Sequence, residues 1–226
     1  MTNVATVRRV PFLAILPDDE LAGLVERMRP RQYRTGTIIF HRDDPGTTLH
    51  IITSGVVKLV LASPEGREVT VGILGPGDFF GELSLLDGGA RSASAVTLEA
   101  TETLTLDREP FVAILERHPE VANGLLTVLG NRLRRTDELI QDILFLDLPG
   151  RIAKQLLALA DERGVATRAG VRIDLRLSQT ELASIVGTTR ESVNRCLNAF
   201  ADRGLLTIDR DAITLRDRDG LKERIY

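Results

Sequence analysis

The stretch from Glu120 to Asp147 is the feature that most restricts what this chain can fold into. Pro119 tolerates the first turn of a helix, and the acid that follows it suits the positive end of the helix dipole. Beyond them, side chains recur at alternating steps of four and three residues, which is the spacing of a seam that faces a parallel helix. The seam comprises Leu125, Leu129, Arg132, Thr136, Leu139, Ile143 and Leu146. It predicts a long helix that pairs with a second copy of the chain, although an ordinary amphipathic helix has the same period.

The middle of this seam is polar, from Arg132 to Asp137. Polar side chains in a helix seam cost stability unless they meet a ligand, one another or water. We therefore predict that a small molecule fills this gap.

Composition narrows the class of protein. A chain of 226 residues with 43% hydrophobic content can form one or two packed domains. No run is long enough to cross a bilayer, and Phe12 to Leu16 is too short for a signal peptide, so the cytoplasm is the expected location and no membrane partner is expected. The single cysteine, Cys196, excludes internal disulfides and multi-thiolate metal sites. No metal ligation is expected at His41, His50 or His118, which lack ligand spacing.

Charge is divided unevenly along the chain. Residues 148–226 carry 14 Lys and Arg against 11 Asp and Glu, a net charge of +3, whereas residues 1–147 carry 15 against 21, a net charge of −6. A basic C-terminal part favours an anion-binding end, although +3 alone does not identify nucleic acid.

Between residues 37 and 106 the period changes to that of short strands. Segments rich in β-branched or apolar residues alternate with turn sequences such as Asp43-Asp44-Pro45-Gly46. The predicted strands are Thr37–Phe40, Leu49–Ile52, Val56–Leu61, Val69–Leu74, Ser94–Leu98 and Thr103–Leu106. Many brief strands indicate a small antiparallel barrel or sandwich, a type of fold that commonly holds one ligand. Short helices are expected at Asp18–Met28 and Phe111–Leu115.

The segment from Gly81 to Ser92 contains groups that can bind a ligand. Gly81 permits close approach of a ligand to the backbone, and the residues after it can form a helical turn whose N–H groups face an anion. Arg91 adds a permanent charge and Ser92 a hydroxyl, while Glu82 can accept from a sugar hydroxyl. These groups match the sugar and phosphate of a cyclic nucleotide. The alternative is a simple salt bridge between Glu82 and Arg91 inside an empty barrel.

The C-terminal part predicts a helix-turn-helix. Asp147 can cap a helix, and the apolar residues of that helix predict a second core: Ile152, Leu156, Leu157 and Leu159. Val165–Gly170 is predicted to be a turn or loop. Ile173–Leu177 is predicted to be a strand. Ser178 to Glu181 is a capping box, the helix runs to Val186, Gly187 makes the turn, and Thr188 or Thr189 caps the next helix. Residues 203–208 and 212–215 form a hairpin, the wing.

The second helix of this motif has two faces. Val193, Cys196, Leu197 and Phe200 share the face that belongs to the core. The other face, which is free to enter a DNA groove, holds Arg190, Glu191, Asn194, Arg195 and Asn198. Arginine can donate two hydrogen bonds to guanine and glutamate can accept from cytosine, each good pair giving ~1–3 kcal/mol of discrimination. The alternative is a solvated charged helix face.

The chain resembles regulators of the CRP/FNR family. Phe80-Gly81-Glu82-Leu83 followed by Arg91-Ser92-Ala93 is similar to the phosphate-binding cassette of cyclic AMP receptor proteins. The resemblance implies that the backbone from Gly81 to Leu83 and Ser92 bind phosphate, that Glu82 binds the ribose 2′-hydroxyl, and that Arg91 neutralises the phosphate.

The same resemblance implies roles for the long helix. Thr136 contacts the purine amino group, and the nucleotide lies between the barrel and the dimer helices. Asp137 stands where the best-known cyclic AMP sensor has a serine, and its carboxylate can accept from an adenine amino group, change the choice of ligand or reject nucleotide. Other branches of the family bind haem, 2-oxoglutarate or no ligand.

For DNA, the resemblance implies a TGTGA-like half-site. Arg190, Glu191 and Arg195 match the base-reading residues, and Ser178 and Gln179 sit where the family touches phosphate. Thr189 and Asn194 complete the expected DNA-binding set, and RNA polymerase is an expected partner.

We therefore predict an α+β chain with three parts. Residues 1–117 form a double-stranded β-helix, or jelly-roll, of the cyclic-nucleotide-binding type, residues 118–147 a dimerisation helix, and residues 148–226 a winged helix-turn-helix. The expected function is that of a homodimeric transcription regulator switched by cyclic AMP or a related nucleotide. A constitutive family member that needs no ligand is the alternative. An enzyme is not expected, because no nucleophile, base and orienting group stand together.

Overall fold

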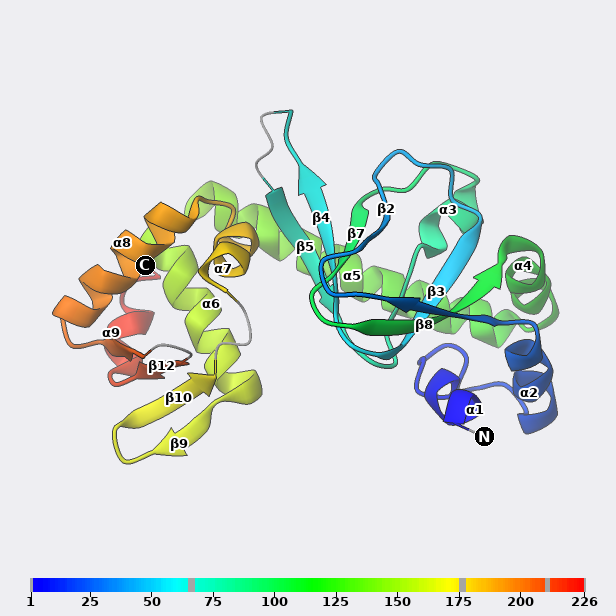
Figure 1. The fold of residues 1–226 in the computed structure, drawn as a ribbon, viewed down its shortest axis with the longest axis horizontal. Coiled ribbons are helices and arrows are strands. Elements are labelled where there is room, and N and C mark those ends of the chain that lie inside the picture. Colours follow the sequence, from blue (N-terminus) through cyan, green and yellow to red (C-terminus); the bar gives the residue numbers. More distant parts are fainter. Residues whose placement is uncertain (1, 65–67, 175–177, 210–211, 226) are drawn as a thin grey trace. The chain divides into compact units, whose positions relative to one another are not determined.

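The computed structural model describes residues 2–64, 68–174, 178–209 and 212–225 (Figure 1). Contacts divide the chain into two compact units. The first comprises Met1–Leu61 and Val71–Arg135, and the second comprises Ala62–Thr70 and Thr136–Tyr226. Within the described ranges, no helix is both long and apolar enough to span a membrane. The predicted division into three parts at residues 117 and 147 stays a prediction.

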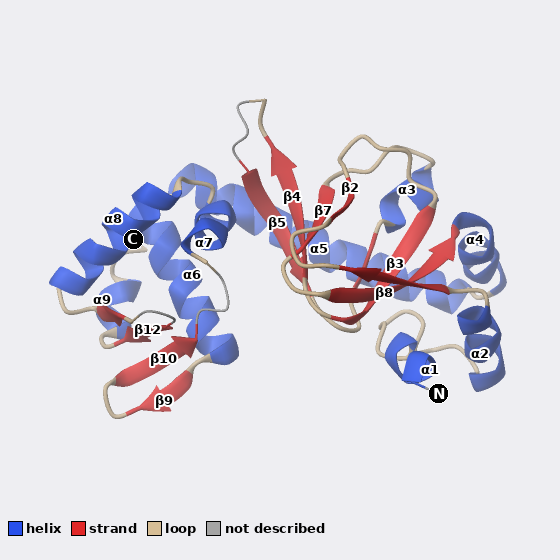
Figure 2. Cartoon of the chain, viewed as in Figure 1, coloured by secondary structure: helices blue, strands red, loops and turns tan. Residues whose placement is uncertain are grey.

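The N-terminal half contains two four-stranded sheets (Figure 2). Neighbouring strands of the first are β1 (Arg29–Tyr33), β8 (Thr101–Asp107), β3 (Thr48–Ser54) and β6 (Phe79–Phe80). Those of the second are β2 (Ile38–Phe40), β7 (Ser94–Thr97), β4 (Val57–Ala62) and β5 (Glu68–Leu74). The pairs β1–β8, β3–β8, β3–β6, β2–β7 and β4–β7 are antiparallel. The predicted jelly-roll type of barrel is therefore confirmed.

An aromatic cluster forms much of the first core. The rings of Phe12 and Phe79 meet edge to face at 4.8 Å, and those of Phe12 and Phe111 at 6.5 Å. Helices α1 (Thr2–Val7), α2 (Asp18–Glu26) and α4 (Arg108–Arg117) contribute to the same core. The expected helices near residues 18–28 and 111–115 are thus present.

Helix α5 (Pro119–Phe145) is the long helix predicted, and the first residue of the predicted seam, Leu125, lies in the first core. Leu125 is only 2% exposed because it packs in the first core together with Val121. The exposed apolar stripe instead contains Leu126 and Leu133, which are 65% and 63% exposed, and Ile140. Leu125 of the predicted seam is therefore covered by the barrel and not by a partner helix, whereas Ile143 of the same seam is 42% exposed, and pairing along the rest of the seam stays a prediction.

The second unit contains the predicted helix-turn-helix and an additional strand. Asp147 accepts from the backbone N–H of Gly150 at 2.8 Å and so caps α6 (Leu148–Arg163), as predicted. The sheet has the strand order β11 (Leu206–Ile208), β12 (Ala212–Leu215), β10 (Gly170–Asp174) and β9 (Val165–Thr167). The prediction of a loop at 165–170 was wrong for β9, and residues 175–177 of the predicted strand lie outside the described residues. Helix α9 (Arg218–Lys222) follows the wing.

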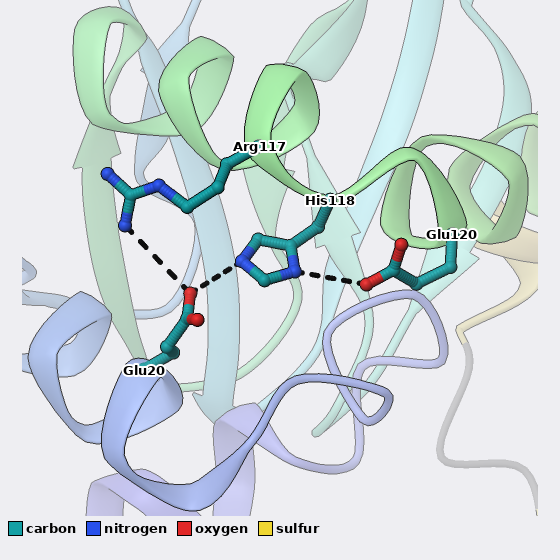
Figure 3. A network of polar contacts seen from close by, with 4 residues as sticks. All are labelled: Glu20, Arg117, His118 and Glu120. Atoms are coloured by element: carbon teal, nitrogen blue, oxygen red, sulfur yellow. Dashed lines mark hydrogen bonds and ion pairs between the residues drawn. The ribbon is translucent and has the colours of Figure 1, made fainter.

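A polar network holds the junction between α4 and α5 (Figure 3). The Nε2 atom of His118 lies 2.5 Å from Oε2 of Glu20 on α2, and its Nδ1 lies 3.0 Å from Oε1 of Glu120 on α5. The last residue of α4, Arg117, approaches the same Glu20 oxygen at 3.9 Å. An imidazole that contacts two carboxylates through both nitrogens satisfies both only when it is protonated. The network raises the pKa of His118, first through the hydrogen bond with Glu120 and then through Glu20.

This network predicts a pH-dependent component of stability. A folded pKa above the ordinary value of 6.5 means that the contribution of His118 is fully present below 6.5 and is lost as the pH rises through the folded pKa. The difference in thermal midpoint between wild type and H118Q should therefore be largest near pH 5 and shrink towards about pH 9. Circular dichroism melts across this range measure it. The control E120Q should reduce the same pH dependence, and an H118Q curve parallel to wild type would contradict the assignment.

Candidate functional site

The predicted phosphate-binding segment forms a tight turn followed by a short helix. Gly81 has φ 84° and precedes α3 (Glu82–Asp87), whose first turn carries the expected backbone N–H groups. A Cβ atom at position 81 would lie 2.4 Å from Nη1 of Arg91 and 3.0 Å from the carbonyl oxygen of Thr48. Only glycine combines this backbone conformation with this close approach.

Arg91 lies inside the barrel wall and is 4% exposed. It donates from Nη1 to the carbonyl oxygen of Gly81 at 2.7 Å and from Nη2 to the carbonyl oxygen of Thr48 at 2.8 Å. The guanidinium carbon also lies 4.2 Å from the centre of the Phe40 ring. Burial lowers the pKa of Arg91, and the nearby charges of Glu82 and Asp44 oppose this shift. The side chain nevertheless stays charged, since arginine does not deprotonate in proteins.

Glu82 is also 4% exposed, and its partner is Arg132 of α5. Arg132 donates from Nη1 to Oε1 of Glu82 at 2.9 Å and from Nη2 to the carbonyl oxygen of Phe79 at 2.5 Å. Among the ion pairs of the described residues there is none between Glu82 and Arg91. The alternative of a simple salt bridge between these two side chains was therefore wrong, and each of them has separate partners.

The cavity at this segment is small. It has a volume of about 40 Å³ and is lined by Phe40, Leu59, Gly81, Glu82, Leu83, Ser84, Arg91, Ser92 and Ala93. Leu83 and Ser92 are exposed at its mouth. Pockets that enclose small ligands measure roughly 300–1,000 Å³. A nucleotide therefore does not fit within this cavity alone.

The remaining predicted ligand contacts lie further along α5. Thr136 and Asp137 are exposed and belong to the second compact unit, whereas Arg132 belongs to the first. Of the three predicted α5 residues, the structure brings Arg132 to the phosphate-binding segment. The roles of all these residues in binding stay predictions.

The helix-turn-helix is built from local signals, as predicted. Ser178 accepts from the backbone N–H of Glu181 at 3.2 Å, and the Glu181 carboxylate accepts from the Ser178 N–H at 2.5 Å, which completes the capping box of α7 (Gln179–Val186). Gly187 turns the chain with φ 69°, and Thr189 accepts from the N–H of Ser192 at 3.3 Å to cap α8 (Arg190–Asp202).

The polar face of α8 carries a hydrogen-bond network that the sequence did not indicate. Asn194 donates to Oε1 of Gln179 at 3.4 Å and accepts from Asn198 at 2.9 Å. Arg195 donates to the hydroxyl of Ser192 at 3.1 Å. These bonds hold the first residue of α7 against the outer face of α8. The amide of Asn194 therefore already has protein partners.

The charged side chains on the polar face of α8 are exposed. Arg190, Glu191 and Arg195 are exposed, so all three can reach a groove surface. The pKa of the Glu191 carboxyl is lowered, first by hydrogen bonding to its own backbone N–H and then by the Thr189 side chain. Glu191 is thus an anionic acceptor, as reading cytosine requires.

The opposite face of α8 is core. Val193, Cys196, Leu197 and Phe200 are all buried, as predicted. Burial raises the pKa of the Cys196 thiol to about 11, and Asp147 adds to this shift. Within the described part of the chain, no three His, Cys, Asp or Glu side chains form a group that could hold a metal ion.

Comparison with known protein families supports both the predicted sensor domain and the predicted DNA-binding domain. Residues 30–118 match the cyclic nucleotide-binding domain, and residues 150–224 match the Crp-like helix-turn-helix domain. A CRP-like cAMP-activated global transcriptional regulator of Mycobacterium tuberculosis is 39% identical over 204 residues, covering 90% of this chain and 91% of the relative. The cyclic AMP receptor protein of Thermus thermophilus is 37% identical over 213 residues, covering 94% and 95% of the two chains.

A solved structure has a similar fold. The c-di-GMP responsive global regulator CLP of Xanthomonas campestris is similar with a TM-score of 0.79 at 26% identity, covering 88% of this chain and 99% of that one. A sheet domain of the cyclic-nucleotide-binding type joined to a winged helix-turn-helix defines a DNA-binding transcription regulator. The chain belongs to the CRP/FNR family of such regulators. This family consists of regulators and not of enzymes, which confirms that expectation.

Proposed function

We propose that the protein is a homodimeric regulator that binds a TGTGA-like palindrome when cyclic AMP, or a closely related cyclic nucleotide, occupies its barrel. The observation that carries the effector proposal is the buried guanidinium of Arg91, held beside Gly81 and the first turn of α3. A fixed cation next to free backbone N–H groups suits a phosphate. The M. tuberculosis relative, described as cAMP-activated, supports cyclic AMP as the first nucleotide to test.

Binding requires an exchange of hydrogen-bond partners. Arg91 donates to two carbonyl oxygens and Glu82 accepts from Arg132, so both side chains already have partners within the protein. We propose that the phosphate replaces the Gly81 carbonyl as acceptor for Arg91 while the bonds to Thr48 remain, and that the ribose 2′-hydroxyl and Arg132 share or exchange the Glu82 carboxylate. Arg132 lies on α5, so this exchange acts directly on the helix that we propose forms the dimer. Thr136 and Asp137 would meet the purine further along that helix.

For DNA binding, the exposed polar side chains of α8 would enter the groove. Arg190, Glu191 and Arg195 would read base edges, while Ser178, Gln179 and Thr189 would position the motif on phosphates and Asn194 would line the groove. In a dimer the two recognition helices must lie about 34 Å apart, one turn of DNA. A coupling free energy of ~1–3 kcal/mol between the two sites suffices for a useful switch. Recruitment of RNA polymerase and a cytoplasmic location belong to the same proposal.

Titration calorimetry with cyclic AMP and cyclic GMP tests the effector. We expect a saturable heat for one of them, together with tighter binding of a palindromic TGTGA duplex at fixed salt when that nucleotide is present. Because log affinity depends on salt for any DNA-binding protein, the comparison needs a scrambled duplex at the same ionic strength.

A constitutive regulator is the second candidate, and one observation favours it. The charged groups at the site already have partners within the protein, since Glu82 and Arg132 form an ion pair. The cavity at the phosphate-binding segment also measures only about 40 Å³. A flat calorimetric trace with both nucleotides, combined with strong binding of the palindrome by the protein alone, would decide for this candidate.

The exposed stripe on α5 predicts the dimer contact. If Leu126, Leu133 and Ile140 face their counterparts, L133E removes two buried leucines and places two carboxylates together, at a cost of roughly 3–6 kcal/mol per dimer. Sedimentation equilibrium should show a shift from dimer towards monomer. The control V165E changes an equally exposed apolar residue on β9 and should remain dimeric; a fully dimeric L133E protein would contradict this interface.

A further inference from the structure

His50 on β3 is a buried histidine to which the predicted phosphate-binding segment assigns no role. It is 6% exposed, and its ring stacks on Phe80 with centroids 4.8 Å apart and planes 13° apart. Phe40 lies 5.8 Å from the same ring. Phe80 immediately precedes Gly81, and Phe40 is the ring beneath the Arg91 guanidinium. His50 is thus enclosed by the same side chains that build the anion site.

A hydrogen-bond relay connects His50 to Arg91. Nε2 of His50 lies 3.2 Å from the hydroxyl of Thr48, and Nη2 of Arg91 donates to that hydroxyl, also at 3.2 Å. Thr48 and His50 are two residues apart on one strand, so their side chains emerge on the same face. Arg91 also donates to the Thr48 backbone carbonyl, so Thr48 holds one edge of the guanidinium through both of its oxygens.

The imidazole in this relay is neutral at physiological pH. Burial is the main cause that lowers the pKa of His50 to about 3, and the charges of Arg91 and Arg31 lower it further. A neutral ring hydrogen-bonds to Thr48 without repelling the nearby guanidinium, which a protonated ring would do. A hydrocarbon ring of similar size would fill the space but would leave the Thr48 hydroxyl without this partner.

Two nitrogen atoms in this cluster remain buried without a partner. Among the described residues, neither Nδ1 of His50 nor Nε of Arg91 has a hydrogen-bond partner. Unpaired buried polar atoms are costly and are few in native structures. The relay therefore fixes the Nη edge of the guanidinium while Nε keeps an unused donor.

We propose that His50 is a positioning residue of the anion site: it orients the Thr48 hydroxyl, and Thr48 in turn fixes the Arg91 guanidinium in the orientation in which it meets a phosphate. This inference rests on the proposed binding of a cyclic nucleotide phosphate by Arg91. It does not place His50 in contact with the nucleotide.

Substitution of His50 separates hydrogen bonding from packing. H50F keeps an aromatic ring beside Phe80 and removes the partner of Thr48, whereas H50Q retains a polar group that can reach it. We expect H50F to weaken cyclic AMP binding about three- to tenfold and H50Q to restore most of the loss. Binding of adenosine, which lacks the phosphate, should be the same in all three proteins. In a cycle with T48V, the double variant should bind cyclic AMP no more weakly than T48V alone.

A second measurement requires no nucleotide. The side-chain N–H signals of Arg91, followed by NMR, should show restricted rotation of the guanidinium in wild type and H50Q and faster rotation in H50F. Unchanged cyclic AMP affinity and unchanged Arg91 signals in H50F would overturn the positioning role, as would an equal loss of adenosine and cyclic AMP binding. If wild type does not bind cyclic AMP but Arg91 still loses restraint in H50F, the proposed effector fails and the positioning role stands.

Discussion

The R195A variant is expected to lose its preference for the palindrome over a scrambled duplex while still binding cyclic AMP. Arg195 is exposed on the polar face of α8, where its guanidinium can donate two hydrogen bonds to one guanine. One such contact discriminates by ~1–3 kcal/mol, and a dimer on two half-sites contains two of them. The expected loss is therefore roughly 30-fold to 10⁴-fold in the ratio of specific to non-specific affinity.

The matched control is R203A. Arg203 is the C-cap residue that directly follows the same helix, it is exposed, and it is outside the predicted base-reading set. Fluorescence anisotropy at one fixed salt concentration should show the palindrome preference intact in R203A and absent in R195A. An R195A protein that lost cyclic AMP binding to the same extent as palindrome binding would contradict the separation of the two sites.

The R91A variant should show the reverse behaviour. It removes the buried cation proposed to neutralise the phosphate, and truncating one partner of a buried charged hydrogen-bond pair costs about 2–5 kcal/mol, or roughly 30-fold to several thousandfold in affinity. Calorimetry should show greatly weakened cyclic AMP binding, and cyclic AMP should no longer tighten binding of the palindrome. Binding to non-specific DNA at low salt should remain, because the residues proposed to contact DNA lie in the second unit.

Arg91 also holds two backbone carbonyls, so its loss affects folding as well as binding. R91K therefore accompanies R91A, because lysine keeps the charge but not the fork of donors. The exposed Arg42 provides the control R42A, which removes a cation from the same unit and should bind cyclic AMP normally. A cyclic AMP response in a folded R91A protein that equals wild type would eliminate phosphate binding by this residue.

The helix-turn-helix could be predicted in detail because its signals are local. The capping box of Ser178 and Glu181, the turn at Gly187 and the two faces of α8 are each written within a few neighbouring positions. Such signals do not depend on which other element packs nearby. The network from Gln179 to Asn194 could not be predicted, because it joins side chains of two helices whose crossing is set by the core.

Two of the strands missed by sequence reasoning, β1 and β9, have no apolar pattern. Strand β1 has the sequence Arg-Pro-Arg-Gln-Tyr and is mostly exposed, so only its pairing with β8 makes it a strand. Strand β9 is fully exposed and forms only by pairing with β10. Edge strands of this kind are defined by hydrogen bonds to a distant segment, and periodicity cannot reveal them.

The face of α5 that the barrel covers and the partner of Glu82 could not be predicted, for a related reason. The helix carries two adjacent apolar stripes, and their spacing does not say which one the barrel covers. Packing of Leu125 in the first core decides this and leaves Leu126 and Leu133 outside. The same rotation of the helix brings Arg132 to Glu82, 50 residues earlier in the chain. A contact over this sequence distance follows from the tertiary fold alone.

The thiol of Cys196 can report on access to the inner face of α8. It is the single cysteine of the chain, and its raised pKa together with its place in the second core leaves almost no reactive thiolate while α8 stays packed. Because Cys196 also lines a cavity of about 510 Å³ beside Asp147 and Arg195, alkylation of the native protein is expected to be slow but does not require α8 to unpack. The labelling rate, measured with and without operator DNA, shows whether DNA changes access to this thiol, independently of any event in the barrel.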